Sequence, residues 1–215
     1  MKIPKVTAHA GAMHTEDNTI DSFKTGLESG ADIVELDICQ APDGEYVVTH
    51  DMPNSYTPGC VPYLEDFLKL LAEYPYKQLN IDVKMPMDIA GIELLCKKCG
   101  VLDQVFFTGI DDKILPCVQQ AAGSIPYFYN SGATDDLPAL IARIRDTGAI
   151  GLNSEKGRLN KEITSAIRAE GLLVSLWTIG YDDDYATYIL YGTDSITTLD
   201  PQKAIKTIKE LMINE

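Results

Sequence analysis

Short apolar stretches rich in β-branched and aromatic residues alternate with amphipathic segments along the whole sequence. Each apolar stretch is typical of a strand, and each following segment has helical periodicity with capping residues at its ends. The predicted strands are residues 6–10, 33–38, 79–84, 104–109, 125–130, 149–153, 173–179 and 195–199. The predicted helices are residues 19–30, 62–74, 87–100, 112–123, 136–148, 160–171, 182–192 and 200–215. This repeat predicts a (β/α)8 TIM barrel, with a doubly wound open sheet as the alternative.

One further apolar stretch interrupts the repeat after the second predicted strand. Residues 45–50 follow Asp43-Gly44, a pair that favours a tight hairpin turn. We therefore expect a small β-hairpin excursion on an otherwise regular α/β barrel. No linker or low-complexity segment divides the chain, so we expect a single domain over residues 1–215.

The charge balance limits the classes of partner. A formal net charge of −14 and a pI near 4.5 argue against nucleic acid and against anionic membrane surfaces. No stretch approaches 18 apolar residues, so no membrane span is expected. An odd count of five cysteines in a chain of 215 residues is typical of a reducing compartment. We expect a cytoplasmic location, although a signal peptide that had been removed would leave no trace. The sequence makes no prediction of oligomeric state.

Polar residues gather at the ends of the predicted strands, where TIM barrels carry out their chemistry. Glu35 and Asp37 lie two residues apart on one strand, and Asp82 and Lys84 lie two residues apart on the next. Side chains at this spacing point to the same face of a strand. Three carboxylates aimed into a barrel are costly without a counter-ion, and oxygen ligands suit Mg²⁺ or Ca²⁺. His9 falls at the end of the first strand, so it joins this group.

The segment AHAGAMHTEDNTIDSFKTGLESGADIVELDICQAPDGEYVVTHD, residues 8–51, resembles the opening of the glycerophosphodiester phosphodiesterase family. That family reads A-H-R-G, P-E-N-T, G-A-D-x-V-E-L-D-V and D-G-x-x-V-V-x-H-D. The later stretches LNIDVK, GAIGLN, LVSLWTI and GTDSITTLDP also match, so the resemblance extends to residue 201. It implies metal-dependent hydrolysis of a small-molecule phosphodiester to an alcohol and sn-glycerol 3-phosphate.

The resemblance also implies roles for individual residues. Glu35, Asp37 and Asp82 would bind a divalent cation, Ca²⁺ or Mg²⁺. His9 and His50 would be the acid–base pair, and we assign His9 as the base and His50 as the acid in the first step. The same comparison implies that Lys84 would hold the phosphate and that Trp177 would line the alcohol side of the pocket.

The sequence departs from the family pattern around the phosphate. Ala10 stands where the family has arginine, and His14 is one candidate for its replacement. The insert after His50 is short. These departures leave two alternatives open. One is a non-catalytic barrel that binds a divalent cation and an anionic ligand, and the other is a related barrel phospholipase that acts on lysolipids.

Overall fold

The computed structural model describes residues 2–132 and 134–213, and the strands within these ranges form a closed barrel. The strands are β1 (Lys5–Ala8), β2 (Ile33–Gln40), β3 (Tyr46–Val48), β4 (Gln78–Val83), β5 (Val105–Ile110), β6 (Tyr127–Asn130), β7 (Gly151–Glu155), β8 (Leu173–Ile179) and β9 (Ser195–Thr198). Parallel pairing runs from β1 through β9, β8, β7, β6, β5 and β4 to β2. The β1–β2 pairing, in which Thr7 lies opposite Ile33, closes the ring. The predicted TIM barrel is confirmed, and an open sheet is excluded.

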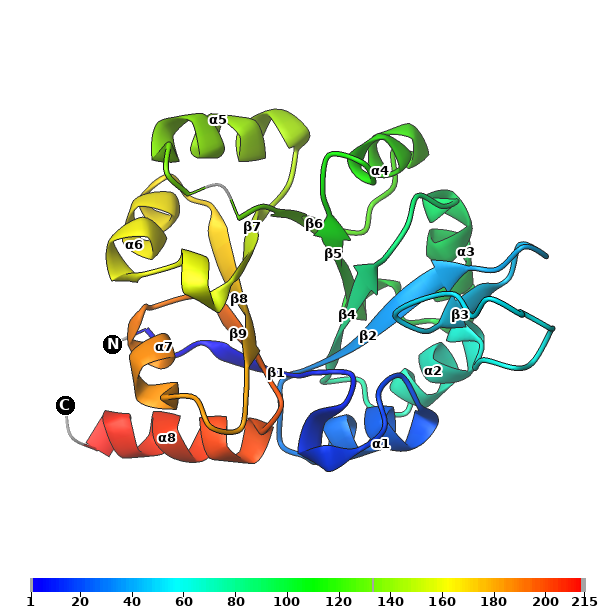
Figure 1. Cartoon of the computed structure of the whole chain (residues 1–215), viewed down its shortest axis with the longest axis horizontal. Coiled ribbons are helices and arrows are strands. Elements are labelled where there is room, and N and C mark those ends of the chain that lie inside the picture. Colours follow the sequence, from blue (N-terminus) through cyan, green and yellow to red (C-terminus); the bar gives the residue numbers. More distant parts are fainter. Residues whose placement is uncertain (1, 133, 214–215) are drawn as a thin grey trace.

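Helices surround the strands on the outside (Figure 1). They are α1 (Ile20–Glu28), α2 (Leu64–Leu71), α3 (Ile89–Cys99), α4 (Leu115–Ala121), α5 (Leu137–Thr147), α6 (Lys161–Ala169), α7 (Tyr185–Leu190) and α8 (Pro201–Ile213). Three 3-10 helices that the sequence did not predict also lie in the described ranges: η1 (Ala12–His14), η2 (Leu102–Gln104) and η3 (Lys156–Arg158). None of the described helices is both long and apolar enough to cross a bilayer.

Helix α4 begins three residues later than the sequence predicted. The carboxylate of Asp111 accepts hydrogen bonds from the N–H groups of Lys113 and Ile114, so this segment forms a turn before the helix. Pro116 then occupies the first turn of α4, a position that needs no intrahelical N–H. Helix α7 also begins three residues later than predicted, after the N-cap residue Asp184. The remaining helices begin within two residues of the predicted start, and side chains cap four of them, as Asp136 does for α5.

The barrel interior changes from apolar to polar along the strands. At the amino-terminal end, Ile33, Phe106 and Phe128 form a small buried cluster. Burial of each such side chain contributes roughly 1.5–3 kcal/mol. Side chains two positions further along a strand point to the same side. In these three strands they are Glu35, Thr108 and Asn130. The apolar cluster therefore forms a floor beneath a polar mouth at the carboxyl end of the strands.

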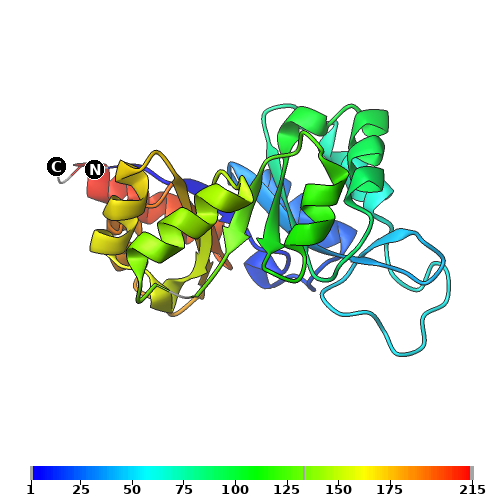
Figure 2. The same cartoon turned by 90° about the horizontal axis from the view of Figure 1, so that it is seen from above.

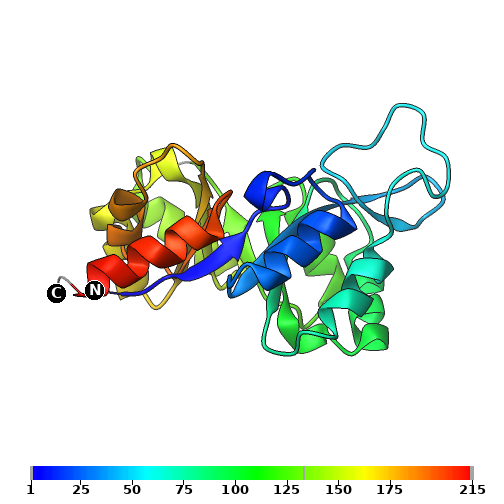
Figure 3. The same cartoon turned by 90° about the horizontal axis from the view of Figure 1, so that it is seen from below.

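The β2–β3 hairpin and the loop that follows it project beyond the barrel, as Figures 2 and 3 show. Strand β3 runs antiparallel to β2, with Val48 opposite Ile38. A bridge between Val47 and Tyr63 ties the far end of the loop back to β3. The predicted hairpin excursion is confirmed, and it carries His50 back toward the mouth.

Candidate active site

A cavity of about 340 Å³ opens at the carboxyl end of the barrel strands. All seven residues singled out in the sequence line it: His9, Glu35, Asp37, His50, Asp82, Lys84 and Trp177. Further lining residues are Asn80, Val83, Thr108, Gly109, Asp111, Ile114, Asn130, Asn153, Thr178 and Thr197. Residues separated by up to 168 positions in the sequence therefore meet in one place, where the barrel rule locates chemistry.

Glu35, Asp37 and Asp82 form a compact acidic cluster. One carboxylate oxygen from each lies within 4.8 Å of the others. Asp37 of β2 lies directly opposite Asp82 of β4 in the sheet register. Glu35 is 6% exposed and Asp37 is 4% exposed. Two oxygens that share one Ca²⁺ at about 2.3–2.6 Å are at most about 5 Å apart, so the cluster fits a single divalent ion.

Hydrogen bonds from the loop after β1 hold two of these carboxylates. The Ala10 N–H donates to Glu35 Oε2 at 2.8 Å. Asn18 Nδ2 donates to Asp37 Oδ2 at 2.8 Å, and Asn18 Oδ1 accepts the backbone N–H of Asp37 at 2.9 Å. Asn18 has a φ of 61°, a conformation that asparagine tolerates better than most residues. The family-like E-D-N-T stretch thus contributes a residue that positions Asp37.

Burial and mutual repulsion make the acidic cluster reluctant to carry its full charge. Burial, followed by the charges of Asp37 and Asp82, raises the pKa of Glu35 well above its ordinary range. Burial likewise raises the pKa of Asp82, although Lys84 opposes the shift. A buried group whose ionised form is disfavoured in this way is stabilised when a cation binds.

The ammonium group of Lys84 lies between two of the carboxylates. Its Nζ is 2.8 Å from Asp37 Oδ1 and 2.6 Å from Asp82 Oδ2. Burial disfavours the charge on Lys84, but the Asp82 and Asp37 carboxylates outweigh burial and raise the pKa of Lys84. Lys84 therefore stays protonated and partly neutralises the cluster.

The two histidines have different surroundings. Burial lowers the pKa of His9, and the charges of Asp37 and Asp17 offset only part of that shift. The His50 side chain is 64% exposed, and its Nδ1 lies 2.8 Å from Asp51 Oδ2. Burial therefore favours the neutral form of His9, whereas the His50 ring is open to solvent beside the Asp51 carboxylate.

The position that holds arginine in the family is occupied by a small, buried residue in this chain. Ala10 is 4% exposed, and its carbonyl accepts the N–H of Asn18. His14, the candidate replacement, does not line the cavity. The His14 ring stacks on the Tyr181 ring with a centroid distance of 4.1 Å, and the backbone N–H of His14 donates a hydrogen bond to Tyr181 Oη. Lys84 is the only lysine or arginine among the described residues that line the cavity.

Sequence reasoning missed the neutral polar residues of the cavity wall, although the rules that found the carboxylates also apply to them. Asn80 precedes Asp82 by two residues and so shares its face of β4. Asn130 ends β6, and Asn153 lies in β7. Thr108 Oγ1 is within hydrogen-bond distance of Asn80 Oδ1 at 2.8 Å and of Asp82 Oδ1 at 3.1 Å.

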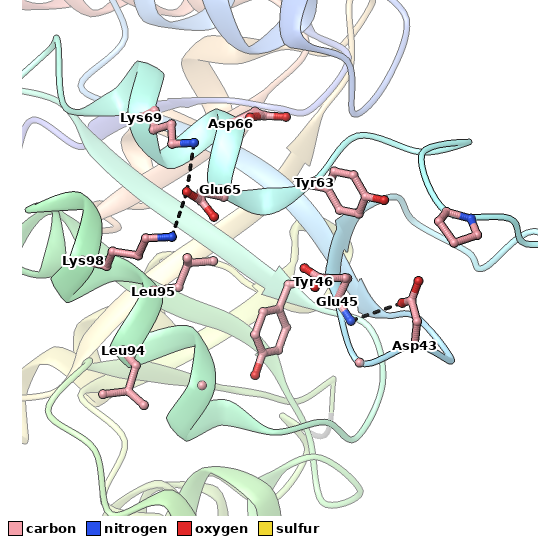
Figure 4. Close-up of a pocket in the computed structure, with 13 residues that line it drawn as sticks. Asp43, Glu45, Tyr46, Tyr63, Glu65, Asp66, Lys69, Leu94, Leu95 and Lys98 are labelled. Carbon is pink, nitrogen blue, oxygen red and sulfur yellow. Dashed lines mark hydrogen bonds and ion pairs between the residues drawn. The ribbon is translucent and has the colours of Figure 1, made fainter.

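A larger hollow of about 740 Å³ lies on the outside of the barrel, between the hairpin and helices α2 and α3 (Figure 4). Both of its lysines are already paired, since Glu65 contacts Lys69 and Lys98. No carboxylate cluster or histidine lines this hollow. The reactive groups of the described residues are therefore at the barrel mouth.

Comparison with known proteins shows what this chain is similar to. Residues 8–80 match the family model described as the glycerophosphoryl diester phosphodiesterase family. Over that segment, this chain is similar to the glycerophosphodiester phosphodiesterases. A glycerophosphodiester phosphodiesterase of Caldanaerobacter subterraneus subsp. tengcongensis is 24% identical over 241 aligned positions, covering 95% of this chain and 98% of the relative. The alignment is longer than this chain of 215 residues, so the relative has segments that this chain lacks.

Solved structures of the family share the fold. A glycerophosphodiester phosphodiesterase of Parabacteroides distasonis superimposes with a TM-score of 0.79 at 19% identity, covering 98% of this chain and 99% of the other. A phosphodiesterase of Oleispira antarctica, solved in complex with the product sn-glycerol-3-phosphate, superimposes with a TM-score of 0.73 at 21% identity. The overlap covers 96% of this chain and 97% of the Oleispira chain.

Proposed function

We propose that this protein hydrolyses glycerophosphodiesters to an alcohol and sn-glycerol 3-phosphate with the help of a divalent cation, Ca²⁺ or Mg²⁺. The observation that carries the proposal is the meeting of three carboxylates, two of them buried and one partly buried, with two imidazoles in one cavity at the barrel mouth. The family and the product-bound Oleispira structure support the substrate class.

The proposed cation ligands are Glu35, Asp37 and Asp82. A divalent cation held there would supply positive charge to the non-bridging oxygens of the phosphodiester. Because Lys84 already contacts Asp37 and Asp82, its ammonium group is close enough to share those phosphate oxygens. Two positive centres would then offset the developing negative charge.

The proposed proton transfers use the two histidines. His9 is buried and its neutral form is favoured, which suits a base that takes the proton from the attacking glycerol hydroxyl. His50 lines the cavity, and the contact between its Nδ1 and Asp51 Oδ2 orients the ring, so we assign His50 as the acid that protonates the leaving alcohol. The hydroxyl oxygen would attack the phosphorus as the bond to the leaving alcohol breaks, which gives a cyclic glycerol phosphate and an alcohol that takes its proton from His50. Water would then open the cyclic phosphate to sn-glycerol 3-phosphate, with the roles of His9 and His50 exchanged.

A direct assay tests this function. Chelator-treated protein is incubated with glycerophosphocholine, glycerophosphoethanolamine or glycerophosphoinositol. Each substrate is tested in the presence of Ca²⁺, of Mg²⁺ or of chelator alone. The release of sn-glycerol 3-phosphate is measured enzymatically. We expect release only with added cation, and loss of release in Glu35→Gln. Release at the full rate in chelator would exclude the cation, and no release from any diester would exclude the function.

The replacement of the family arginine by the buried Ala10 favours a second candidate function, a barrel that binds a cation and an anion without turnover. Without a guanidinium, only Lys84 among the described lining residues carries a permanent positive charge. The same samples separate the two functions by calorimetry with inorganic phosphate. Binding of cation and phosphate without product release would support the binding protein. Adding a lysolipid to the substrate panel tests the phospholipase alternative.

A further inference from the structure

Two asparagines, Asn130 of β6 and Asn153 of β7, lie next to each other in the cavity wall, opposite each other in the sheet register. We call them the amide pair. Asn153 is 6% exposed, so it is almost fully enclosed by the barrel. Neither residue has a role in cation binding or in the proton transfers described above.

The backbone fixes which way each amide group points. The Gly109 N–H, which can only donate, is 3.0 Å from Asn130 Oδ1. The same oxygen accepts a hydrogen bond from Asn153 Nδ2 at 3.2 Å. Position 109 has to be glycine, because it has a φ of 78° and a Cβ there would come within 2.4 Å of the Val83 carbonyl oxygen. The orientation of the amide pair therefore follows from an unambiguous donor.

This orientation leaves one donor and one acceptor unused. Asn130 Nδ2 and Asn153 Oδ1 have no hydrogen-bond partner among residues 2–132 and 134–213. The buried side-chain polar atoms without a partner in the described residues are Thr164 Oγ1 and Thr193 Oγ1, so the two free amide atoms are open to water in the cavity. A ligand that displaces this water has to replace both of its hydrogen bonds. Both side chains line the cavity, so a molecule in the cavity is the available partner.

A donor beside an acceptor is the pattern that recognises a hydroxyl group. A hydroxyl donates to Asn153 Oδ1 and accepts from Asn130 Nδ2. A phosphate oxygen would be repelled by Asn153 Oδ1, and a quaternary ammonium group would leave both amide groups unsatisfied. The chemistry of the amide pair therefore selects a neutral, hydroxyl-bearing group.

The location of the amide pair identifies which part of the substrate carries that hydroxyl. The cation cluster is on β2 and β4, and the glycerol hydroxyl that attacks the phosphorus has to lie beside it. The amide pair is on β6 and β7, and β7 pairs with the strand that carries Trp177. Asp111 also lines this side, and Oδ1 of its carboxylate accepts the backbone N–H groups of Lys113 and Ile114. This side of the cavity is left for the leaving alcohol.

We propose that the amide pair selects substrates whose leaving alcohol is a polyol, such as inositol or glycerol, over substrates whose leaving alcohol is choline. This inference rests on the proposed function and specifies its head group. The two substrate classes share the glycerol phosphate end, so a difference between them reports only on the head-group side.

The test compares kcat/KM for glycerophosphoinositol and glycerophosphocholine in wild type, Asn153→Leu and Asn130→Leu. We expect wild type to prefer the inositol diester by about 10-fold or more, and each leucine variant to lose most of that preference while retaining choline-diester turnover. The ratio is taken within one sample, so partial loss of folded protein cancels. The exposed amide variant Gln120→Ala on α4 is the control and should keep the wild-type ratio. Equal or better use of the choline diester by wild type, or an unchanged ratio in both variants, would overturn the inference.

A binding experiment separates this inference from the proposed function. Saturation-transfer NMR is recorded with myo-inositol and with tetramethylammonium, which has the quaternary ammonium group of choline but no hydroxyl, on wild type and Asn153→Leu. We expect transfer to inositol that is lost in Asn153→Leu, and little transfer to tetramethylammonium. If no diester is cleaved but inositol binds in this way, the proposed function fails and the amide pair stands as a polyol site. If diesters are cleaved but inositol transfer is absent or unchanged in the variant, the amide-pair inference fails and the function stands.

Discussion

Replacing Glu35 by glutamine should make the protein more stable when divalent cations are removed. Glu35 is buried between Asp37 and Asp82, and its raised pKa means that ionisation is costly in the folded state. A carboxyl group whose pKa is higher in the folded state than in the unfolded state gives its full stabilisation below the unfolded value. That stabilisation is lost as the pH rises through the folded value. Glutamine mimics the protonated form at every pH.

The size of the effect can be worked from the cluster geometry. A carboxylate pair separated by 4.8 Å repels by about 3.5 kcal/mol at an effective dielectric constant of about 20. Glu35 faces two such neighbours, and the ammonium group of Lys84 cancels about one of these repulsions. The Ala10 N–H bond favours the charged form by roughly 1 kcal/mol. The remainder is about 2–3 kcal/mol, which corresponds to a rise in Tm of roughly 5–10 °C for a chain of this size.

The assay is thermal or urea unfolding of wild type and Glu35→Gln in chelator between pH 4 and pH 8, with exposed Glu73→Gln as the control. The stability difference should be largest at pH 8 and should vanish below about pH 4.5, the ordinary value for glutamate. Saturating Ca²⁺ or Mg²⁺ should stabilise wild type and reverse the order. An unchanged or lower stability of Glu35→Gln at pH 8 in chelator would refute the reasoning.

Three further changes test other parts of the site. His50→Ala should lower kcat by about 10²–10⁴-fold with a small change in KM, and an unchanged kcat in steady-state assays would remove His50 from the mechanism. Lys84→Met should tighten cation binding, measured by calorimetry, because the substitution removes a positive charge that competes with the cation for Asp37. The same substitution should raise KM. Weaker cation binding in Lys84→Met would contradict this role. Trp177 is 38% exposed in the cavity wall. Trp177→Ala should raise KM several-fold with little effect on kcat, and a selective loss of kcat would argue against simple head-group contact.

The fold and the acidic cluster could be predicted because both follow from local periodicity. Apolar alternation located the strands, and the spacing of two between Glu35 and Asp37 placed both carboxylates on one face of β2. Because the carboxyl ends of barrel strands meet at one end of the barrel, Asp82 at the end of the next strand could be placed beside them from the sequence alone. The same reasoning reached His9 at the end of β1 and, through the hairpin, His50.

Contacts between distant segments could not be predicted. His14 stacks on Tyr181, which is 167 residues away, so no local pattern distinguishes it from a phosphate ligand. The position of Lys84 between Asp37 and Asp82 depends on the register of two strands. These features require coordinates because they arise from packing rather than from spacing in the sequence.

The amide pair is an intermediate case. Asn130 and Asn153 occur singly in their strands, and a lone asparagine in a strand carries little information about function. Applying the strand-end rule to every barrel strand would have placed both near the mouth. Their shared hydrogen bonds, which leave one donor and one acceptor free, are visible only in the structure.

A calorimetric titration of Ca²⁺ and Mg²⁺ into chelator-treated wild type and Asp37→Asn tests the central claim most directly. Asparagine has nearly the same shape as Asp37 and can still accept the hydrogen bond from Asn18, so the variant should fold. We expect one divalent ion per wild-type chain and a large loss of affinity in Asp37→Asn. Equal affinity in the two proteins, or no ion bound to wild type, would contradict a cation site at the barrel mouth.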